Sequence, residues 1–273
     1  MPAPLPLRAH WAWMSRLLTL LPLLAAAADA QLNTPGTPPN TLTPEERAAG
    51  WKLLFDGHSF QGWRDPATQN PPNDGWSIVD GALRTRPNPK IKDDLITEDL
   101  FENFELTFEW RVDPGHNGGV KYLIQSMNCW ASSELAPRGV KGGRATQRTD
   151  VRPGEKLTCN NAGLEYQLVD DQRHRDGKDP LSQSGSIYKI APALSLAALP
   201  AGEWNQSRIV LRANTAEHWL NGRRVAHLEL ESDALKQRLP SAALYWIRVS
   251  PIALQHHNDT AAYRSLKIRT IPD

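Results

Sequence analysis

The stretch from Asn161 to Ile190 carries residue types that can do acid–base chemistry, in two short alternating runs on either side of a charged loop. A half-buried strand over residues 164–169 would place Glu165 and Gln167 on one face and the large apolar side chains on the other. On such a face the Glu165 carboxylate could accept a proton while the neighbouring Gln167 amide orients a substrate. The same pattern fits a solvated outer face, because Glu and Gln on strands usually face water.

The loop that follows this strand is rich in oxygen ligands. Asp170, Asp171 and His174, followed by Asp176 and Asp179, have the density of hard ligands that a divalent cation prefers. Their spacing is not that of an EF-hand, and a solvated loop has the same composition. Both interpretations stay open: a plain loop, or a cation held by Asp170, Asp171 and His174.

Short alternating segments separated by turn signals run through most of the chain and predict an antiparallel β-sandwich or barrel. Asp80-Gly81 is a hairpin signal, and Asn221-Gly222 fits a type I′ turn. Residues 232–238 form the only segment with a sustained helical period. The 22 Pro and 18 Gly also indicate many turns.

Residues 104–112 alternate almost perfectly between apolar and polar side chains. We expect Phe104 and Trp110 to face the core and Glu109 and Arg111 to lie on the polar face. The glycines before Val120 then turn the chain into residues 120–125, which we expect to pair antiparallel with residues 104–112.

Residues 126–160 form a long excursion, and loops of that length inside compact domains are usually lids or insertions. The only two cysteines, Cys129 and Cys159, bracket this segment. We expect them to form a disulfide, which would stabilise the fold by roughly 3 to 4 kcal/mol on the chain-entropy model. Two separate buried thiols are the alternative; neither cysteine has the spacing of a zinc or CxxC site.

The N-terminal sequence predicts export. Arg16 precedes an apolar run over residues 17–28, and Ala28-Asp29-Ala30 fits a cleavage site, so residues 1–30 are expected to be a signal peptide whose start is either Met1 or Met14. The run is short and broken by Pro22, which disfavours a transmembrane helix. The localisation expected from it is periplasmic or secreted.

Composition bounds the remaining possibilities. Residues 31–50 are rich in Pro and Thr and predict a flexible linker with at most one helical turn after Thr43, so the domain is expected to span residues 51–273. A net charge of +1 with both signs spread along the chain gives no footprint for nucleic acid. Ten Trp suit either a β core or stacking against sugar rings.

A set of short motifs then resembles one known family. The motifs are Leu53-Leu54-Phe55-Asp56-Gly57 with Gly62-Trp63, Trp76-Ser77-Ile78-Val79-Asp80-Gly81, Phe104-Glu105-Leu106, Asn117-Gly118-Gly119-Val120, Glu165-Tyr166-Gln167, Glu203-Trp204-Asn205, His218-Trp219-Leu220-Asn221-Gly222 and Leu254-Gln255-His256-His257. In this order, over about residues 50–271, the chain resembles the 3-keto-disaccharide hydrolase domain family. The resemblance implies an all-β, concanavalin A-like jelly-roll sandwich of two antiparallel sheets with a carbohydrate groove on the concave face. The chain departs from the family in its long segment 126–160 and in having His257 where the family more often has Asp-His-Gly.

The activity that the resemblance implies sets the site expectations. A ketone at carbon 3 of a sugar acidifies the hydrogen at carbon 2, so a base can remove it and the glycosidic oxygen at carbon 1 can leave, before water adds. Such an enzyme needs a base, an acid and a donor or divalent cation for the enolate oxygen, and it implies an oxidoreductase that makes the keto sugar. The candidates are Glu165, His218 and Lys121 as catalytic residues and Glu109, Arg111, Gln167, Tyr188, Asn205, Gln255 and His256 as substrate-binding residues. We expect Glu165, Gln167, Lys121 and His218 to share the concave face of one sheet, with Trp219 in the core.

Other interpretations stay open at this point. His218 also suits a surface position beside a hairpin turn, and Lys121 a solvated strand position. A non-catalytic carbohydrate-binding module is the main alternative function, because this type of sandwich also serves lectins. A hydrolase with two carboxylates is a more distant one, with Glu109 and Glu165 facing each other across the concave sheet.

Overall fold

The structure is a computed structural model of the 273-residue chain and describes residues 37–66, 74–89, 93–131, 157–238 and 247–273. The predicted signal peptide lies outside these residues. The described residues contain three short helices: α1 (Pro44–Ala48), the 3-10 helix η1 (Arg175–Lys178) and α2 (Asp233–Arg238). None of the described helices is long and apolar enough to cross a membrane.

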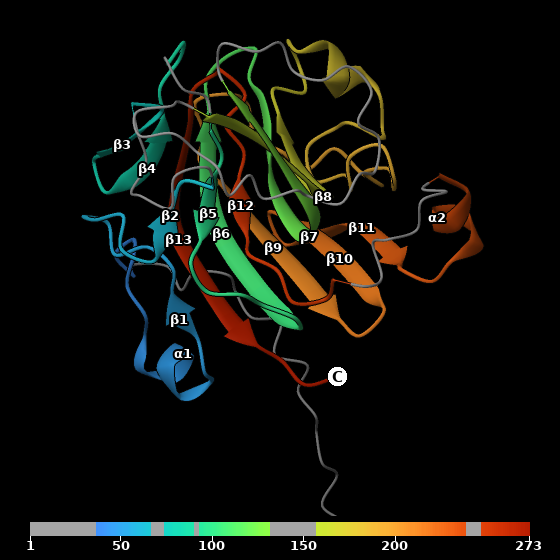
Figure 1. The fold of residues 1–273 in the computed structure, drawn as a ribbon, viewed down its shortest axis with the longest axis horizontal. Coiled ribbons are helices and arrows are strands. Elements are labelled where there is room, and N and C mark those ends of the chain that lie inside the picture. The colour runs from blue at the N-terminus through green and yellow to red at the C-terminus, as the bar shows by residue number, and fades with distance from the viewer. Residues whose placement is uncertain (1–36, 67–73, 90–92, 132–156, 239–246) are drawn as a thin grey trace, which may run out of the picture. The chain divides into compact units, whose positions relative to one another are not determined.

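Two antiparallel sheets make up the described fold (Figure 1). The larger sheet has the order β11-β10-β9-β6-β13-β4-β3, with β1 beside β13. Its strands are β1 (Lys52–Leu53), β3 (Trp76–Val79), β4 (Ala82–Thr85), β6 (Phe104–Val112), β9 (Asn205–Arg212), β10 (Thr215–Leu220), β11 (Arg223–Glu229) and β13 (Ala261–Thr270). The smaller sheet has the order β2-β5-β12-β7-β8, with β2 (Trp63–Arg64), β5 (Leu95–Thr97), β7 (Asn117–Ala131), β8 (Leu157–Val169) and β12 (Ala253–Leu254).

The core lies between the two sheets. Phe104 and Phe108 of β6 meet Tyr122 of β7 and Tyr166 of β8, at ring-centroid distances of 6.1 Å and 5.6 Å respectively. All four side chains are at most 2% exposed. The apolar face predicted for residues 104–112 therefore packs against the other sheet, and the prediction of an all-β sandwich of two antiparallel sheets is confirmed.

Local signals gave several elements correctly. Asp80 and Gly81 have φ of 51° and 71°, and Asn221 and Gly222 have φ of 48° and 80°, as type I′ turns require. The segment predicted to be helical over residues 232–238 is α2.

The pairing expected for residues 120–125 is wrong. They belong to β7, which pairs with β8 and β12 in the smaller sheet, whereas β6 lies between β9 and β13 in the larger one. The turn after β6 therefore carries the chain from one sheet to the other, and alternation alone could not show this because both strands bury one face.

Residues 37–50 are attached to the sandwich, so the prediction of a flexible linker does not hold for them. The Asn40 amide donates to the Gly81 carbonyl at 2.8 Å and accepts from the Ser265 backbone N–H at 2.8 Å. Helix α1 starts at a capping box between Thr43 and Glu46, and Glu46 also pairs with Lys267 at 2.6 Å.

The excursion predicted over residues 126–160 is shorter than expected, because both of its ends continue strands β7 and β8. The register sets Cys129 directly opposite Cys159. The rest of the excursion, residues 132–156, lies outside the described residues.

Candidate active site

The face of the smaller sheet that points away from the larger sheet carries the candidate site; we call it the outer face. Tyr122 and Tyr166 point into the core, so by alternation Lys121 and Glu165 point to the outer face. The register makes Lys121 and Glu165 direct cross-strand neighbours and places Gln167 opposite Gly119. Lys121, Glu165 and Gln167 therefore share one face of a sheet, as predicted.

A buried carboxylate holds the lysine in place. Asp94 immediately precedes β5, is 6% exposed, and lies 3.4 Å from the Lys121 ammonium. The same Asp94 oxygen accepts from the Asn161 amide at 3.0 Å, and its other oxygen accepts from the His256 backbone N–H at 2.9 Å. Because its oxygens accept three hydrogen bonds, Asp94 is fixed as the counter-ion of Lys121.

Electrostatics separate the roles of the two cross-strand neighbours. Burial raises the pKa of Glu165, an effect that Lys121 opposes and Asp94 reinforces. Burial on its own would lower the pKa of Lys121, but the carboxylates of Asp94 and Glu165 outweigh it, so the pKa of Lys121 lies above its ordinary value. Lys121 therefore stays protonated, next to the Glu165 carboxylate, which takes up a proton more readily than an exposed glutamate does.

The backbone of Gly119 makes room for Glu165. A Cβ atom at Gly119 would lie 2.5 Å from Oε1 and 2.6 Å from Cγ of Glu165. The Glu165 side chain therefore lies directly over this glycine, and any larger residue there would displace the carboxylate. Ala253, the β12 neighbour of Lys121, adds only a methyl group on the other side.

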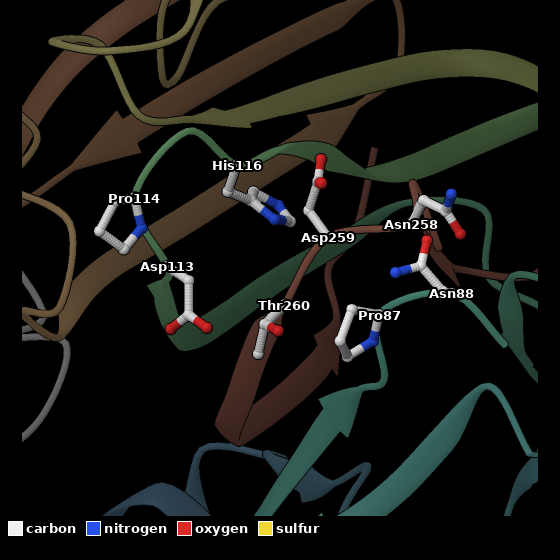
Figure 2. Close-up of a pocket in the computed structure, with 8 residues that line it drawn as sticks. All are labelled: Pro87, Asn88, Asp113, Pro114, His116, Asn258, Asp259 and Thr260. Atoms are coloured by element: carbon white, nitrogen blue, oxygen red, sulfur yellow. The ribbon is translucent and has the colours of Figure 1, made fainter.

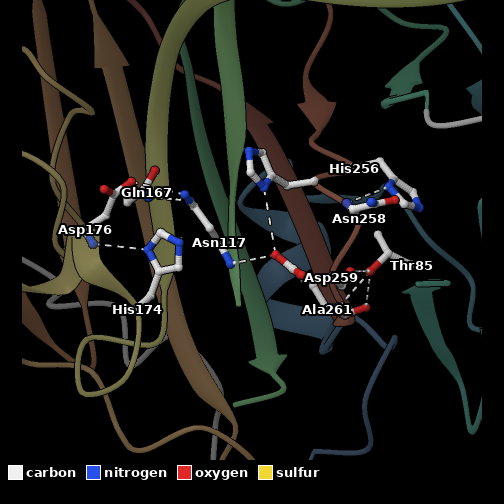
Figure 3. A network of polar contacts seen from close by, with 10 residues as sticks. Thr85, Asn117, Gln167, His174, Asp176, His256, Asn258, Asp259 and Ala261 are labelled. Atoms are coloured by element: carbon white, nitrogen blue, oxygen red, sulfur yellow. Dashed lines mark hydrogen bonds and ion pairs between the residues drawn. The ribbon is translucent and has the colours of Figure 1, made fainter. Parts of the chain in front are cut away.

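A polar network extends from Gln167 toward the end of the sheet. The Gln167 amide donates to Asn117 Oδ1 at 2.8 Å, and the Asn117 amide donates to Asp176 at 3.1 Å. The Asn117 backbone N–H donates to Asp259 at 3.3 Å, so Asn117 lies between the two carboxylates (Figure 3). Gln167 is buried and its Oε1 atom has no hydrogen-bond partner among the described residues.

Three more predicted residues lie close to this face. The Tyr188 backbone N–H donates to the Glu165 carbonyl at 3.0 Å, and the Gln255 backbone N–H donates to the Gly119 carbonyl at 2.9 Å. His256 accepts from the Asn258 backbone N–H at Nδ1, so Nε2 must carry the proton that it donates to the Gly75 carbonyl at 3.1 Å. His256 is thus a neutral positioning residue whose backbone binds Asp94.

His218 does not belong to this face, and the expectation that it shares it is wrong. It lies on β10 of the larger sheet, is fully buried between the sheets, and bonds Tyr122 at 2.8 Å and the Gly185 carbonyl at 2.9 Å. Trp219 was expected in the core but is half-buried on the other face, with Arg208 4.9 Å from its ring centroid. The alternation of β10 was right, but its core face was assigned the wrong way round.

Three other candidates are also distant from Glu165. Arg111 and Glu109 lie on the outside of the larger sheet, where Arg111 stacks on Trp204 at 4.8 Å and Glu109 pairs with Arg264 at 2.6 Å. Asn205 is buried on β9 and accepts from the Leu199 backbone N–H and the Asn221 amide, both at 2.8 Å. Glu109 and Glu165 therefore face opposite sides of the sandwich, which removes the hydrolase with these two carboxylates.

The proposed cation ligands hold their own loop together. Asp170 accepts from the backbone N–H groups of Gly115 and Gln172, and Asp171 accepts from that of Ser184. His174 accepts from the Asp176 backbone N–H at 3.1 Å. In the part of the chain that the structure describes, no three His, Cys, Asp or Glu side chains are placed to hold a metal ion.

The sequence did not reveal Asp94, Asn161 or Gly119. Asp94 is an acidic residue at the start of an apolar strand, and Gly119 is a glycine next to a predicted site strand, so each had a weak local signal. The partners of Asp94, which are Lys121 and Asn161, lie 27 and 67 residues away in the sequence, so these contacts can be seen only in the structure.

Comparisons with known proteins identify the family of the chain. Residues 50–269 match the 3-keto-alpha-glucoside-1,2-lyase-like domain. The chain therefore belongs to this family, and the resemblance found in the sequence is confirmed. A 3-keto-disaccharide hydrolase of Bacteroides thetaiotaomicron is 32% identical over 192 residues, which cover 67% of this chain and 60% of that relative. The matched part is thus less than two thirds of the relative's length.

Solved structures support the fold. A candidate glycosyl hydrolase from Parabacteroides distasonis ATCC 8503 has a TM-score of 0.65 at 24% identity and covers 86% of this chain and 100% of its own. A second one from the same strain has a TM-score of 0.56 at 23% identity and covers 81% and 99%. At these identities the likeness concerns the sandwich and its topology only.

Proposed function

We propose that this protein is an enzyme that cleaves 3-keto-glycosides at its outer-face site. The observation that carries the proposal is a half-buried carboxylate, Glu165, with a raised pKa directly opposite the ammonium of Lys121. A base and a cation on one face are what proton abstraction beside a ketone needs. The name of the Bacteroides thetaiotaomicron relative supports the same substrate class.

In the proposed reaction Glu165 removes the hydrogen from carbon 2 of the keto sugar. The electron pair moves toward the carbon 3 oxygen, where the Lys121 ammonium stabilises the enolate. The enolate then expels the oxygen at carbon 1, which takes a proton from the now protonated Glu165 or from the Tyr188 hydroxyl. Water adds to the resulting unsaturated ketone, so the overall change is hydrolysis.

Neighbouring residues serve this chemistry by holding groups still. Asp94 fixes Lys121, whose positive charge balances its own, and it accepts a hydrogen bond from the Asn161 amide. Gln167 shares the face by strand alternation and Gln255 follows directly after β12; both would orient the sugar hydroxyls. No step in this scheme needs a second catalytic carboxylate or a metal ion.

The test compares a 3-keto-glucoside with its parent glucoside. We expect turnover of the keto form only, and Glu165→Gln should lower kcat by about two to four orders of magnitude. Glu109→Gln is the matched control, since it makes the same change on the opposite side of the sandwich and should leave kcat nearly unchanged. Full activity in Glu165→Gln would remove the proposed base.

A carbohydrate-binding module is the second candidate, because the fold alone does not fix catalysis. It predicts binding of the keto sugar without turnover in the same assay. The raised pKa of Glu165 favours the enzyme, since a binding surface has no need for a carboxylate that takes up a proton easily.

Cellular context forms a separate part of the proposal and rests on the sequence. The basic and apolar N-terminal segment with its Ala28-Asp29-Ala30 site supports export to the periplasm or the medium. A 3-keto sugar must first be made by oxidation of a hydroxyl, so a sugar oxidoreductase would supply the substrate. Edman sequencing of the exported protein should begin at Gln31.

A further inference from the structure

A recess lies at one end of the sandwich, where several strands begin or end. It has a volume of about 300 Å³ and is lined by residues that follow β4, connect β6 to β7 and precede β13 (Figure 2). The lining residues are Pro87, Asn88, Asp113, Pro114, His116, Asn258, Asp259 and Thr260. We call this recess the end pocket.

His116 is the buried member of the end pocket. It is 1% exposed, and neither of its ring nitrogens has a hydrogen-bond partner among the described residues. Its backbone is fully used, because its N–H donates to Asp113 and its carbonyl accepts from Asp170. Figure 2 shows the imidazole between Pro114 and Asp259. Buried polar atoms without partners are rare and indicate a missing ligand or water.

The charges around the pocket define what could bind. Burial lowers the pKa of His116 to about 3; His257, His174 and His256 add to this effect, and Asp170 opposes it. The imidazole is therefore neutral, with one donor and one acceptor nitrogen. Asp113, which lies 3.9 Å from the Arg84 guanidinium, and Asp259 add carboxylates that disfavour a phosphate or carboxylate ligand.

A metal ion fits the pocket poorly. Among the residues that the structure describes, no three His, Cys, Asp or Glu side chains are placed to hold one. The Asp259 carboxylate already accepts from the Asn117 backbone, and His257 lies 3.8 Å from it. With anions and metal ions disfavoured, the pocket is best suited to a neutral ligand whose groups both donate and accept hydrogen bonds.

We propose that the end pocket binds one neutral sugar ring, as a second carbohydrate site separate from the Glu165 face. Sugar hydroxyls both donate and accept, so they match the two free nitrogens of His116 and the carboxylates of Asp113 and Asp259. The volume lies at the lower end of small-molecule sites and suits a single ring. The choice of a sugar among polyhydroxyl ligands rests on the proposed function.

Asn117 gives the second site a physical link to the first. Its side chain bonds Gln167 on the outer face, and its backbone N–H bonds Asp259 in the end pocket. A saccharide bound in the pocket would therefore rest on the same strand end that positions Gln167.

The test uses D-glucose as the probe and follows backbone amide shifts of the 15N-labelled full chain by NMR. In the wild type and in Glu165→Gln, we expect saturable shifts around His116 and Thr260. His116→Phe keeps an aromatic ring at this position and removes both nitrogens, so the affinity at these amides should fall about tenfold or more. Its thermal midpoint should stay equal or rise, because it removes two polar atoms that have no partner.

A second variant covers the case that His116→Phe does not fold. Asn88 has φ of 52°, so Asn88→Gly removes only the amide and keeps the backbone conformation, and it should weaken glucose binding about threefold or more. Unchanged affinity in both variants would overturn the second site. So would the absence of amide shifts at the pocket in about 50 mM glucose, a concentration that detects binding with a Kd up to roughly that value. Tight binding of Ca²⁺ that His116→Phe abolishes would overturn it too. Glucose binding at the pocket without any turnover of a 3-keto-glycoside would instead refute the proposed function and leave the pocket standing.

Discussion

His218 and Glu165 lie on different sheets and differ in what their surroundings do to them. The Tyr122 hydroxyl donates to Nε2 of His218, and Nδ1 must carry the proton because the Gly185 carbonyl can only accept. The ring also packs on Tyr166, with 4.5 Å between centroids. His218 is thus a neutral core residue whose hydrogen bonds join the two sheets, while Glu165 is half-buried on the outer face.

His218→Ala should therefore act on stability. It leaves a cavity and removes the partners of Tyr122 and Gly185, so the free energy of unfolding should fall by about 2 to 4 kcal/mol. Urea unfolding at pH 7 measures this. His227→Ala is the control, because His227 lies on the neighbouring strand in an exposed contact with Glu229 and its loss should cost less than about 1 kcal/mol.

The same histidine predicts the direction of a pH effect. Burial lowers the pKa of His218 to about 4, from an ordinary value of 6.5. Between these values the unfolded chain binds a proton that the folded chain does not, so stability falls as pH drops from 6.5 toward 4. This part of the pH dependence should be missing in His218→Ala, and an unchanged slope between pH 6.5 and 4 would contradict the assignment.

At the scale of elements, the β7–β8 hairpin positions the site. Alternation in the sequence placed Glu165 and Gln167 on one face, and the separate expectation that Lys121 lies on that face also agrees with the register. The register could not be predicted, since it includes a bulge in which residues 123–125 face Gly163 alone. Leu123 takes a φ of 46° there, and a Cβ at Gly163 would meet the Tyr122 carbonyl at 2.5 Å, so the bulge depends on a glycine.

Gly119→Ala tests whether Gly119 positions the Glu165 side chain in this hairpin. The new methyl must displace the carboxylate, so kcat should fall about 10- to 100-fold with a smaller change in KM. Steady-state kinetics with a 3-keto-glucoside would show the split. Since Glu165→Asp has a shorter side chain, its effect should be smaller in the Gly119→Ala protein than in the wild type. Additive effects of the two changes would mean that Gly119 does not position Glu165.

The far part of the same hairpin carries the two cysteines. Directly opposite residues of antiparallel strands have Cα atoms about 4.5 to 5.5 Å apart, which suits a disulfide. We expect mass spectrometry of the protein purified without reductant to find Cys129 bridged to Cys159, and reduction to lower stability by up to about 3 to 4 kcal/mol. The double variant Cys129→Ser and Cys159→Ser should match the reduced protein. Two free thiols in the wild type purified without reductant would contradict the bridge.

At the scale of the whole described fold, the two outward faces differ in kind. The smaller sheet presents the candidate site, and the larger sheet presents Trp204 between Arg111 and Arg264, with their guanidinium groups 4.8 Å and 4.0 Å from its ring centroid. Sequence patterns gave the fold class and the hairpins because those depend on neighbouring residues. They could not tell inner from outer face on β10, since a histidine and a tryptophan suit either one.

Asn40 connects the N-terminal segment to this fold. Its amide bonds Gly81 in the β3–β4 turn and Ser265 in β13, and its φ is 57°. Asn40→Gly keeps that backbone and removes both bonds, so the free energy of unfolding should fall by about 1 to 2 kcal/mol, with kcat unchanged. Thr41→Ala, which removes only a local exposed bond to Pro38, should stay within about 0.5 kcal/mol in the same unfolding assay.

The register that places Lys121 directly across from Glu165 also limits where insertions and deletions can occur in the gene for this protein. A single codon gained or lost between Gly119 and Tyr122 would turn Lys121 into the core and a core side chain outward, because strand faces alternate with every residue. Insertions and deletions should therefore survive selection only outside the stretches 117–122 and 164–169. Codon-by-codon insertion scanning, scored by growth on a 3-keto-glycoside, would map those stretches as the positions where length cannot change.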